Sequence, residues 1–128
     1  MDVMASLKDV GEQYKAGELS AALCKLQDLW DALPEPKSNI LNSFVIIMYA
    51  VKISMQVGDL DLAWRWAILA PNYNPGRQDI GEAEFLVGKV AFERRDFDTA
   101  KEQFTVANLK SRGTVFHGED PKYKTLLK

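Results

Sequence analysis

The chain has 128 residues, of which 47% are apolar, and it carries a net charge of −2. This length and composition predict a single domain, residues 1–128, that folds around its own core without needing a metal or a disulfide. Because the net charge is so small, neither nucleic acid nor a membrane surface is expected as the main partner.

The only cysteine and the N-terminal residues both favour a reducing compartment. Cys24 has no second cysteine to pair with, and its place in an apolar stretch predicts a packed, unreactive thiol. Residues 1–4 lack the basic flank and apolar run of a signal peptide, and no stretch approaches the roughly 18 apolar residues of a membrane-spanning helix. We therefore expect a cytoplasmic protein.

Two helices that meet at Gly17 are predicted for residues 2–33. Apolar residues recur at helical spacing up to Lys15, and a wider apolar stripe follows from Leu19 onward. Pro34-Glu35-Pro36 ends the second helix, because proline cannot continue the helical hydrogen-bond ladder. The pattern predicts a first helical hairpin.

A second pair of helices is predicted for residues 38–70. Ser38 or Asn39 suits the N-cap of a helix that runs to Val57. The centre of this helix is rich in β-branched residues, as strands are, but its length without a breaker favours a buried helix. Gly58 ends the helix, and the acid that follows it caps the next one.

A third pair of helices is predicted for residues 79–110, after a loop rich in proline, asparagine and glycine. These two helices meet at Asp96, the expected N-cap of the second. Residues 111–120 are expected to be irregular. Pro121 suits the first turn of a short helix at 121–128, which would cap the end of the domain.

The three hairpins share a short phrase at their turns: a residue suited to a tight turn, an acid, a large apolar residue and, three positions later, alanine. The copies are 41 and then 37 residues apart, and self-similarity at such periods is typical of stacked helical hairpins. We therefore predict an all-α fold that presents a surface for binding. The phrase reads Gly17-Glu18-Leu19 with Ala22, Gly58-Asp59-Leu60 with Ala63, and Arg95-Asp96-Phe97 with Ala100.

The third copy is similar to a tetratricopeptide repeat at that motif's usual spacing. The match is carried by Gly88, Ala91, Asp96, Phe97, Ala100, Phe104 and Ala107. Small residues at Gly88 and Ala100 let two helices approach closely, while Phe97 and Phe104 fill the space between hairpins. The resemblance extends over most of the chain. It implies a right-handed stack of about three antiparallel hairpins with a short C-terminal capping helix.

In the tetratricopeptide family, the first helix of each hairpin lines a concave groove that holds a partner's peptide or helix. The resemblance implies a groove of aromatic, methionine and lysine side chains, which suit adaptable protein contacts. Tyr49, Lys52 and Lys89 could line that groove or belong to the core, whereas Phe85 is expected in the core. The implied groove residues are Tyr14, Met48, Tyr49, Lys52, Met55, Lys89 and Phe92.

The segment 116–123 reads Phe-His-Gly-Glu-Asp-Pro-Lys-Tyr. It resembles the ending of small bacterial tetratricopeptide-like proteins that accompany polymorphic or contact-dependent toxins as immunity partners. The same residues also make a good turn and helix start, an interpretation that needs no toxin. The resemblance implies a second partner-binding surface made of His117, Lys122, Tyr123 and Lys124.

The sequence carries no recognisable catalytic, cofactor or metal motif, and we expect no enzyme activity and no cofactor. His117 is the only histidine, so no cluster of histidines can hold a metal. Paired acids such as Asp59 and Asp61 fall at predicted helix starts, where negative charge is stabilising, and are interpreted as caps. Basic residues near the C-terminus suggest a nucleic-acid patch, but Glu119 and Asp120 dilute its charge.

Two functions fit these features, and both make another protein the partner. The more specific is an immunity protein that binds and neutralises a cognate bacterial toxin domain. The alternative is a tetratricopeptide scaffold, adaptor or assembly factor that holds a peptide or helix in its groove. Association of two copies is a further option, because Trp30, Trp64 and Trp66 are expected on exposed helix turns.

Overall fold

The computed structural model describes residues 3–37, 42–73 and 80–127, and every regular element within these ranges is a helix. The prediction of an all-α fold is therefore confirmed for the described residues. The α-helices are α1 (Val3–Lys15), α2 (Leu19–Ala32), α3 (Ser43–Val57), α4 (Leu60–Ala67), α5 (Glu82–Glu93) and α6 (Phe97–Ser111). Shorter 3-10 helices span Ala70–Asn72, Thr114–Phe116 and Pro121–Leu127.

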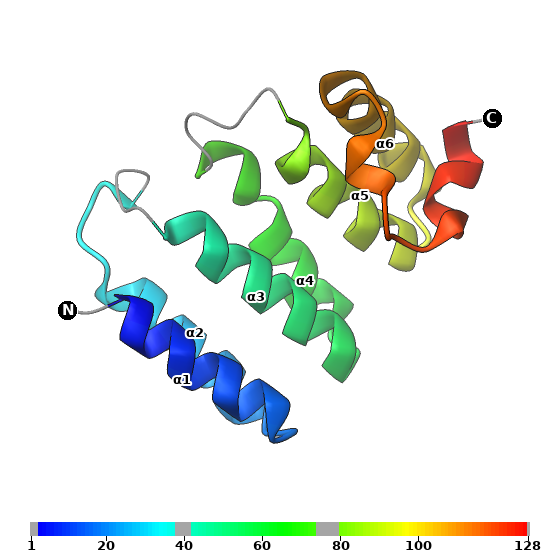
Figure 1. Cartoon of the computed structure of the whole chain (residues 1–128). Helices are drawn as coiled ribbons and strands as arrows, with labels where there is room; N and C mark the ends of the chain where they lie inside the picture. The colour runs from blue at the N-terminus through cyan, green and yellow to red at the C-terminus, as the bar shows by residue number, and fades with distance from the viewer. Residues whose placement is uncertain (1–2, 38–41, 74–79, 128) are drawn as a thin grey trace.

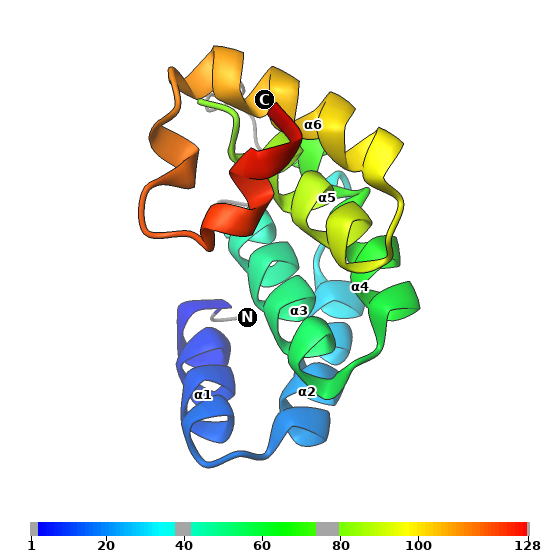
Figure 2. The same cartoon turned by 90° about the vertical axis from the view of Figure 1, so that its right-hand side faces the viewer.

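Each α-helix packs against the one that follows it, so neighbours along the chain are also neighbours in space (Figure 1). The row of helices begins with α1 and α2, continues through α3 and α4, and ends with α5 and α6. Residues 113–127, which we call the tail, then fold back against α5 and α6, as Figure 2 shows in orange and red. Helices α3 and α5 also contact each other directly.

The repeated phrase forms the same kind of turn in all three places. Gly17, Gly58 and Arg95 all have a left-handed backbone, with φ of 79°, 85° and 65°. Glycine adopts this conformation without strain, and an arginine there is uncommon. The acids at Asp59 and Asp96 then cap α4 and α6, because their Oδ1 atoms accept hydrogen bonds from the backbone N–H three residues later, at 3.0 and 3.2 Å. The turn and cap predictions are confirmed at these positions.

Several element boundaries differ from the sequence-based expectation. Helix α3 begins at Ser43, four or five residues after the expected caps at Ser38 and Asn39, which lie outside the described residues. Helix α4 ends at Ala67, and Pro71 belongs to a 3-10 turn, because proline cannot donate to an α-helical ladder.

In the C-terminal half, the start of α5 and the form of the last segments also differ from the expectation. Helix α5 begins at Glu82, after a left-handed Gly81, and residue 79 lies outside the described residues. The stretch 111–120, expected to be irregular, contains the 3-10 helix Thr114–Phe116. The capping segment Pro121–Leu127 is a 3-10 helix, a form that short helical segments commonly take.

A cluster of aromatic rings joins α5, α6 and the tail. Phe104 is fully buried, and its ring centroid lies 5.5 Å from that of Phe85, 5.7 Å from that of Phe116 and 5.6 Å from that of Tyr123. Aromatic pairs at such distances stabilise beyond the area that they bury. The tail is therefore anchored to the last hairpin by Phe116 and Tyr123.

The three tryptophans do not form the exposed surface that was expected of them. Trp30 and Trp66 are buried and meet edge to face, with ring centroids 5.5 Å apart. Trp64 is half-buried, and the Arg94 guanidinium carbon lies 5.1 Å from the centroid of the Trp64 ring. The expectation was wrong because these rings fill the contacts of α4 with α2 and α5. Pairing of two copies through tryptophans loses its basis.

Two further expectations about burial were also wrong. The Cys24 thiol was expected to be packed, but the residue is exposed on α2, because its neighbours Ala22 and Leu26 take the inward positions of that helix. Phe97 was expected to fill the space between hairpins, yet it is 45% exposed and packs edge to face on Phe92, with ring centroids 5.2 Å apart.

The close approach of α5 to α6 gives a direct test of the packing. A Cβ added at Gly88 would lie 2.6 Å from two ring carbons of Phe104, and that ring is held on all sides. We expect Gly88→Ala to lower the free energy of unfolding by about 1–3 kcal/mol, measured by urea titration, because the overpacking outweighs the gain in helix propensity.

Gly11→Ala in α1 is the matched control. A Cβ there meets nothing within 4 Å, so the same substitution should leave stability unchanged or raise it by up to about 1 kcal/mol. If Gly88→Ala were as stable as Gly11→Ala, the described contact between α5 and α6 would be wrong.

Candidate functional site

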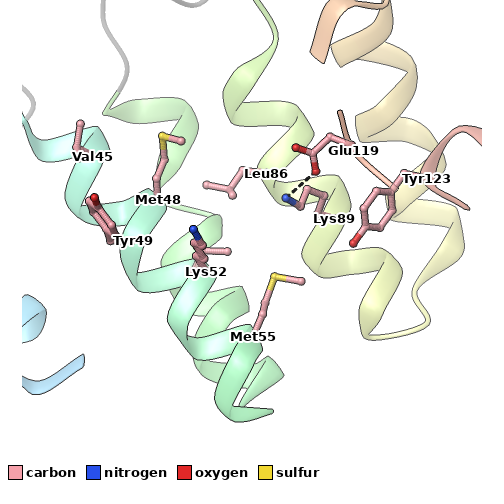
Figure 3. Close-up of a pocket in the computed structure, with 10 residues that line it drawn as sticks. Val45, Met48, Tyr49, Lys52, Met55, Leu86, Lys89, Glu119 and Tyr123 are labelled. Carbon is pink, nitrogen blue, oxygen red and sulfur yellow. Dashed lines mark hydrogen bonds and ion pairs between the residues drawn. The ribbon is translucent and has the colours of Figure 1, made fainter. Parts of the chain in front are cut away.

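A groove of about 670 Å³ lies between α3, α5 and the tail. Figure 3 shows its two helical walls facing each other, with side chains from both and from the tail directed into the space between them. Most of the side chains that line it are apolar, and the charged ones are two lysines and one glutamate. The lining residues are Val45, Met48, Tyr49, Val51, Lys52, Met55, Leu86, Lys89, Glu119 and Tyr123.

The α3 wall is one face of a helix. Val45, Met48, Lys52 and Met55 follow one another at spacings of three or four residues, which places them in a row along the helix. The opposite face carries buried isoleucines and alanine that contact the core. Met48 is 44% exposed, so the row offers an accessible apolar surface on this helix.

The α5 and tail walls are joined by an ion pair. The Lys89 Nζ lies 3.0 Å from Glu119 Oε1, and the side chains are 25% and 33% exposed. The same ammonium lies 5.5 Å from the ring centroid of Phe85, which is favourable for a cation. Partial burial of both groups strengthens the attraction relative to a fully exposed pair. The pair fixes Glu119 at the edge of the groove.

Tyr123 is the buried anchor of the tail wall. Its hydroxyl donates a hydrogen bond to Glu93 Oε1 at 3.0 Å, and the residue is 6% exposed. Burial raises the pKa of the Tyr123 phenol well above its ordinary value, and the neighbouring Glu93 carboxylate raises it further. The neutral phenol is therefore the form that fits this site.

Lys52 projects from α3 without a carboxylate partner among the described residues. The side chain is exposed, and its ammonium lies 5.0 Å from the centroid of the Tyr14 ring on α1. The Tyr14 hydroxyl is in turn fixed by a hydrogen bond that it accepts from Gln56 Nε2, at 2.6 Å. Lys52 thus lines the groove while its ammonium lies toward Tyr14 on the α1 side of α3.

The structure brings together six of the residues that the sequence singled out. Five come from the implied groove, and the sixth, Tyr123, comes from the tail surface that was expected to be separate. The six residues that line the groove are Met48, Tyr49, Lys52, Met55, Lys89 and Tyr123.

The other five candidate residues lie outside the groove lining. Tyr14 supports Lys52 from α1, and Phe92 packs edge to face on Tyr123 in the aromatic cluster, with centroids 5.2 Å apart. Lys122 forms an ion pair with Glu93 at 2.7 Å, which raises the pKa of its ammonium. Lys124 lies 5.9 Å from the Phe116 ring centroid. His117 is exposed.

Sequence reasoning missed groove residues that include Val45, Leu86 and Glu119, although the sequence carries a signal for the first two. Val45 and Leu86 precede Met48 and Lys89 by three positions, so helical spacing carries a signal for both. Glu119 carries no such signal, because it reaches the groove only through the fold of the tail.

The groups in the groove suit non-covalent binding. Among the described residues, no three of His, Cys, Asp and Glu are grouped so that they could hold a metal ion. Within the same residues, no helix is long and apolar enough to cross a membrane. The groove offers apolar contact area, one ion pair and one lysine whose charge is not neutralised.

The buried phenol predicts a dependence of stability on pH. Since folding raises the Tyr123 pKa, the folded state holds the phenol proton more tightly than the unfolded state does. The stability that the buried phenol contributes is therefore lost as the pH rises above about 10, where the unfolded tyrosine loses its proton. The stability advantage of wild type over Tyr123→Phe should therefore shrink between pH 9 and 11, at up to about 1.4 kcal/mol per pH unit. Urea titrations at each pH give this difference. An advantage that stays constant or grows with pH would contradict the buried position of the hydroxyl.

Comparisons with known proteins do not add a relative to this description. No protein-family model matches the chain, and searches of the curated proteins and of the solved structures find no significant match.

Proposed function

We propose that this chain is a non-catalytic protein-binding module whose groove between α3, α5 and the tail holds a segment of another protein. The observation that carries the proposal is the groove itself, which combines accessible methionines with an unneutralised lysine. Methionine side chains adapt to irregular apolar surfaces, and contacts of this kind are enriched at protein interfaces. The groove is about the size of a site for a few side chains of a partner.

The proposed architecture is a tetratricopeptide-like, right-handed stack of antiparallel hairpins. Three features support it: the repeated turns at Gly17, Gly58 and Arg95, the packing of each helix on the next, and the close approach at Gly88. In such a stack the first helices of successive hairpins line one surface, and α3 and α5 take that place here.

A more specific form of the proposal is an immunity protein that neutralises a cognate bacterial toxin domain. Its support is the resemblance of residues 116–123 to the ending of such proteins, together with the contribution of Glu119 and Tyr123 from that segment to the groove. Protection of cells on co-expression with a toxin domain encoded beside this gene favours the immunity form. Binding without protection favours the alternative, a scaffold or adaptor.

Blocking the groove tests the claim that the immunity and scaffold forms share, which is that the groove binds the partner. Met48→Arg places a long charged side chain on an exposed position of α3, so the fold should be retained while partner binding falls by at least about tenfold. Affinity capture from the native cell, followed by mass spectrometry, compares wild type with this variant.

Leu109→Arg on α6 is the matched control, because Leu109 is an apolar residue that is 74% exposed and lies outside the groove. Proteins retained by wild type and Leu109→Arg but lost by Met48→Arg are groove partners. If every specific partner survives Met48→Arg, the groove is not the binding site.

A further inference from the structure

The charged groups of the groove do not balance. Lys89 and Glu119 neutralise each other across the α5 and tail walls, 3.0 Å apart. Lys52, on the opposite wall, has no carboxylate partner among the described residues. The next carboxylate along α5, Glu93, is engaged by Tyr123 and Lys122. The lining therefore keeps one net positive charge, and that charge belongs to Lys52.

A segment that covers the groove must deal with this charge. An apolar partner would strip water from the Lys52 ammonium without replacing it, which is costly for a charged group. A basic partner would face Lys52 and would have to break the pair of Lys89 and Glu119 to find a carboxylate. An acidic side chain would pair with Lys52 directly. The Lys89–Glu119 pair demonstrates that a lysine of this groove can hold a carboxylate at its edge.

The shape of the apolar surface indicates the form of the partner. The α3 row from Val45 to Met55 extends for about 15 Å, or close to three helical turns. Leu86 faces this row from α5 (Figure 3). A groove between two helices with an apolar row on one wall suits the apolar stripe of a third helix, which presents residues at spacings of three, four and seven.

We propose that the occupant of the groove is an amphipathic helix of a partner protein that carries an aspartate or glutamate paired with Lys52. This inference rests on the proposed binding function and narrows it to a partner of one sign of charge. Apolar side chains of that helix contact Met48, Met55 and Leu86, while its acid lies toward the Tyr14 side of α3. Because Glu119 already neutralises Lys89, it repels any second acidic residue of the partner helix that comes near Lys89.

The test uses a displayed library of 16-residue helical peptides, selected on the full chain and counter-selected on Met48→Arg. Peptides that pass are expected to combine an apolar stripe with an acid beside it. Their dissociation constants, measured by fluorescence anisotropy, should rise about tenfold on Lys52→Glu. Lys101→Glu, at an exposed lysine of α6 outside the groove, is the matched control and should leave them unchanged. Replacing the acid of the peptide by lysine should restore binding to Lys52→Glu.

A second variant tests the charge balance without touching Lys52. Glu119→Gln frees Lys89, so acidic peptides should bind severalfold more tightly while a neutral peptide of the same apolar stripe gains nothing. Circular dichroism verifies that each variant stays folded. Weaker binding of acidic peptides to Glu119→Gln than to wild type would overturn the proposal.

The other outcomes separate the proposal from the function beneath it. If the peptides that bind the groove are neutral or basic, the proposal of an acidic partner is wrong, while the proposed binding function is retained. Peptides that bind both Met48→Arg and Lys52→Glu as tightly as wild type remove the groove as a site, and both claims fall. A chain that sediments as a dimer and becomes monomeric on Met48→Arg identifies a second copy as the occupant and overturns the proposal. A library that yields no binder to the folded chain also counts against it.

Discussion

The packing of α5 against α6 around Phe104 is the constraint on which the groove depends. Because Gly88 has no side chain, the Phe104 ring lies directly on the α5 backbone and presents its other surfaces to Phe85, Phe116 and Tyr123. These contacts hold the tail against the last hairpin. Without that anchor, the groove would have the α3 and α5 walls but no third wall and no Glu119.

The same arrangement separates the residues that stabilise from those that are available for binding. Beside the aromatic cluster, the Tyr123 hydroxyl and the Lys122 ammonium both bind the Glu93 carboxylate. These polar contacts attach the tail to α5. Lys52, Met48 and Met55 lie on the opposite wall, and none of them is fully buried. Substitutions on α3 can therefore change binding with little effect on folding, whereas substitutions in the cluster alter both.

Sequence reasoning predicted the local features well, because they depend on neighbouring residues. The left-handed turns at Gly17 and Gly58 and the caps at Asp59 and Asp96 follow from residue type at a fixed position. The family resemblance implied that Met48, Lys52 and Met55 share a groove, and all three line it. Burial was harder, since it depends on which faces meet. Trp30 and Trp66 were expected outside and pack on each other, while Cys24 was expected inside and is exposed. Glu119 was missed as a groove residue because only the folded tail brings it to Lys89.

Methionine methyl groups offer the most direct measurement of whether a partner occupies the groove. Met48 and Met55 lie in it, while Met4 is exposed on α1, outside its lining, so the chain carries both probe and control. In spectra of protein labelled with ¹³C at the methionine methyl groups, addition of a captured partner should shift or broaden the Met48 and Met55 signals and leave Met4 unchanged. Unchanged signals from Met48 and Met55 in the presence of saturating partner would contradict the account.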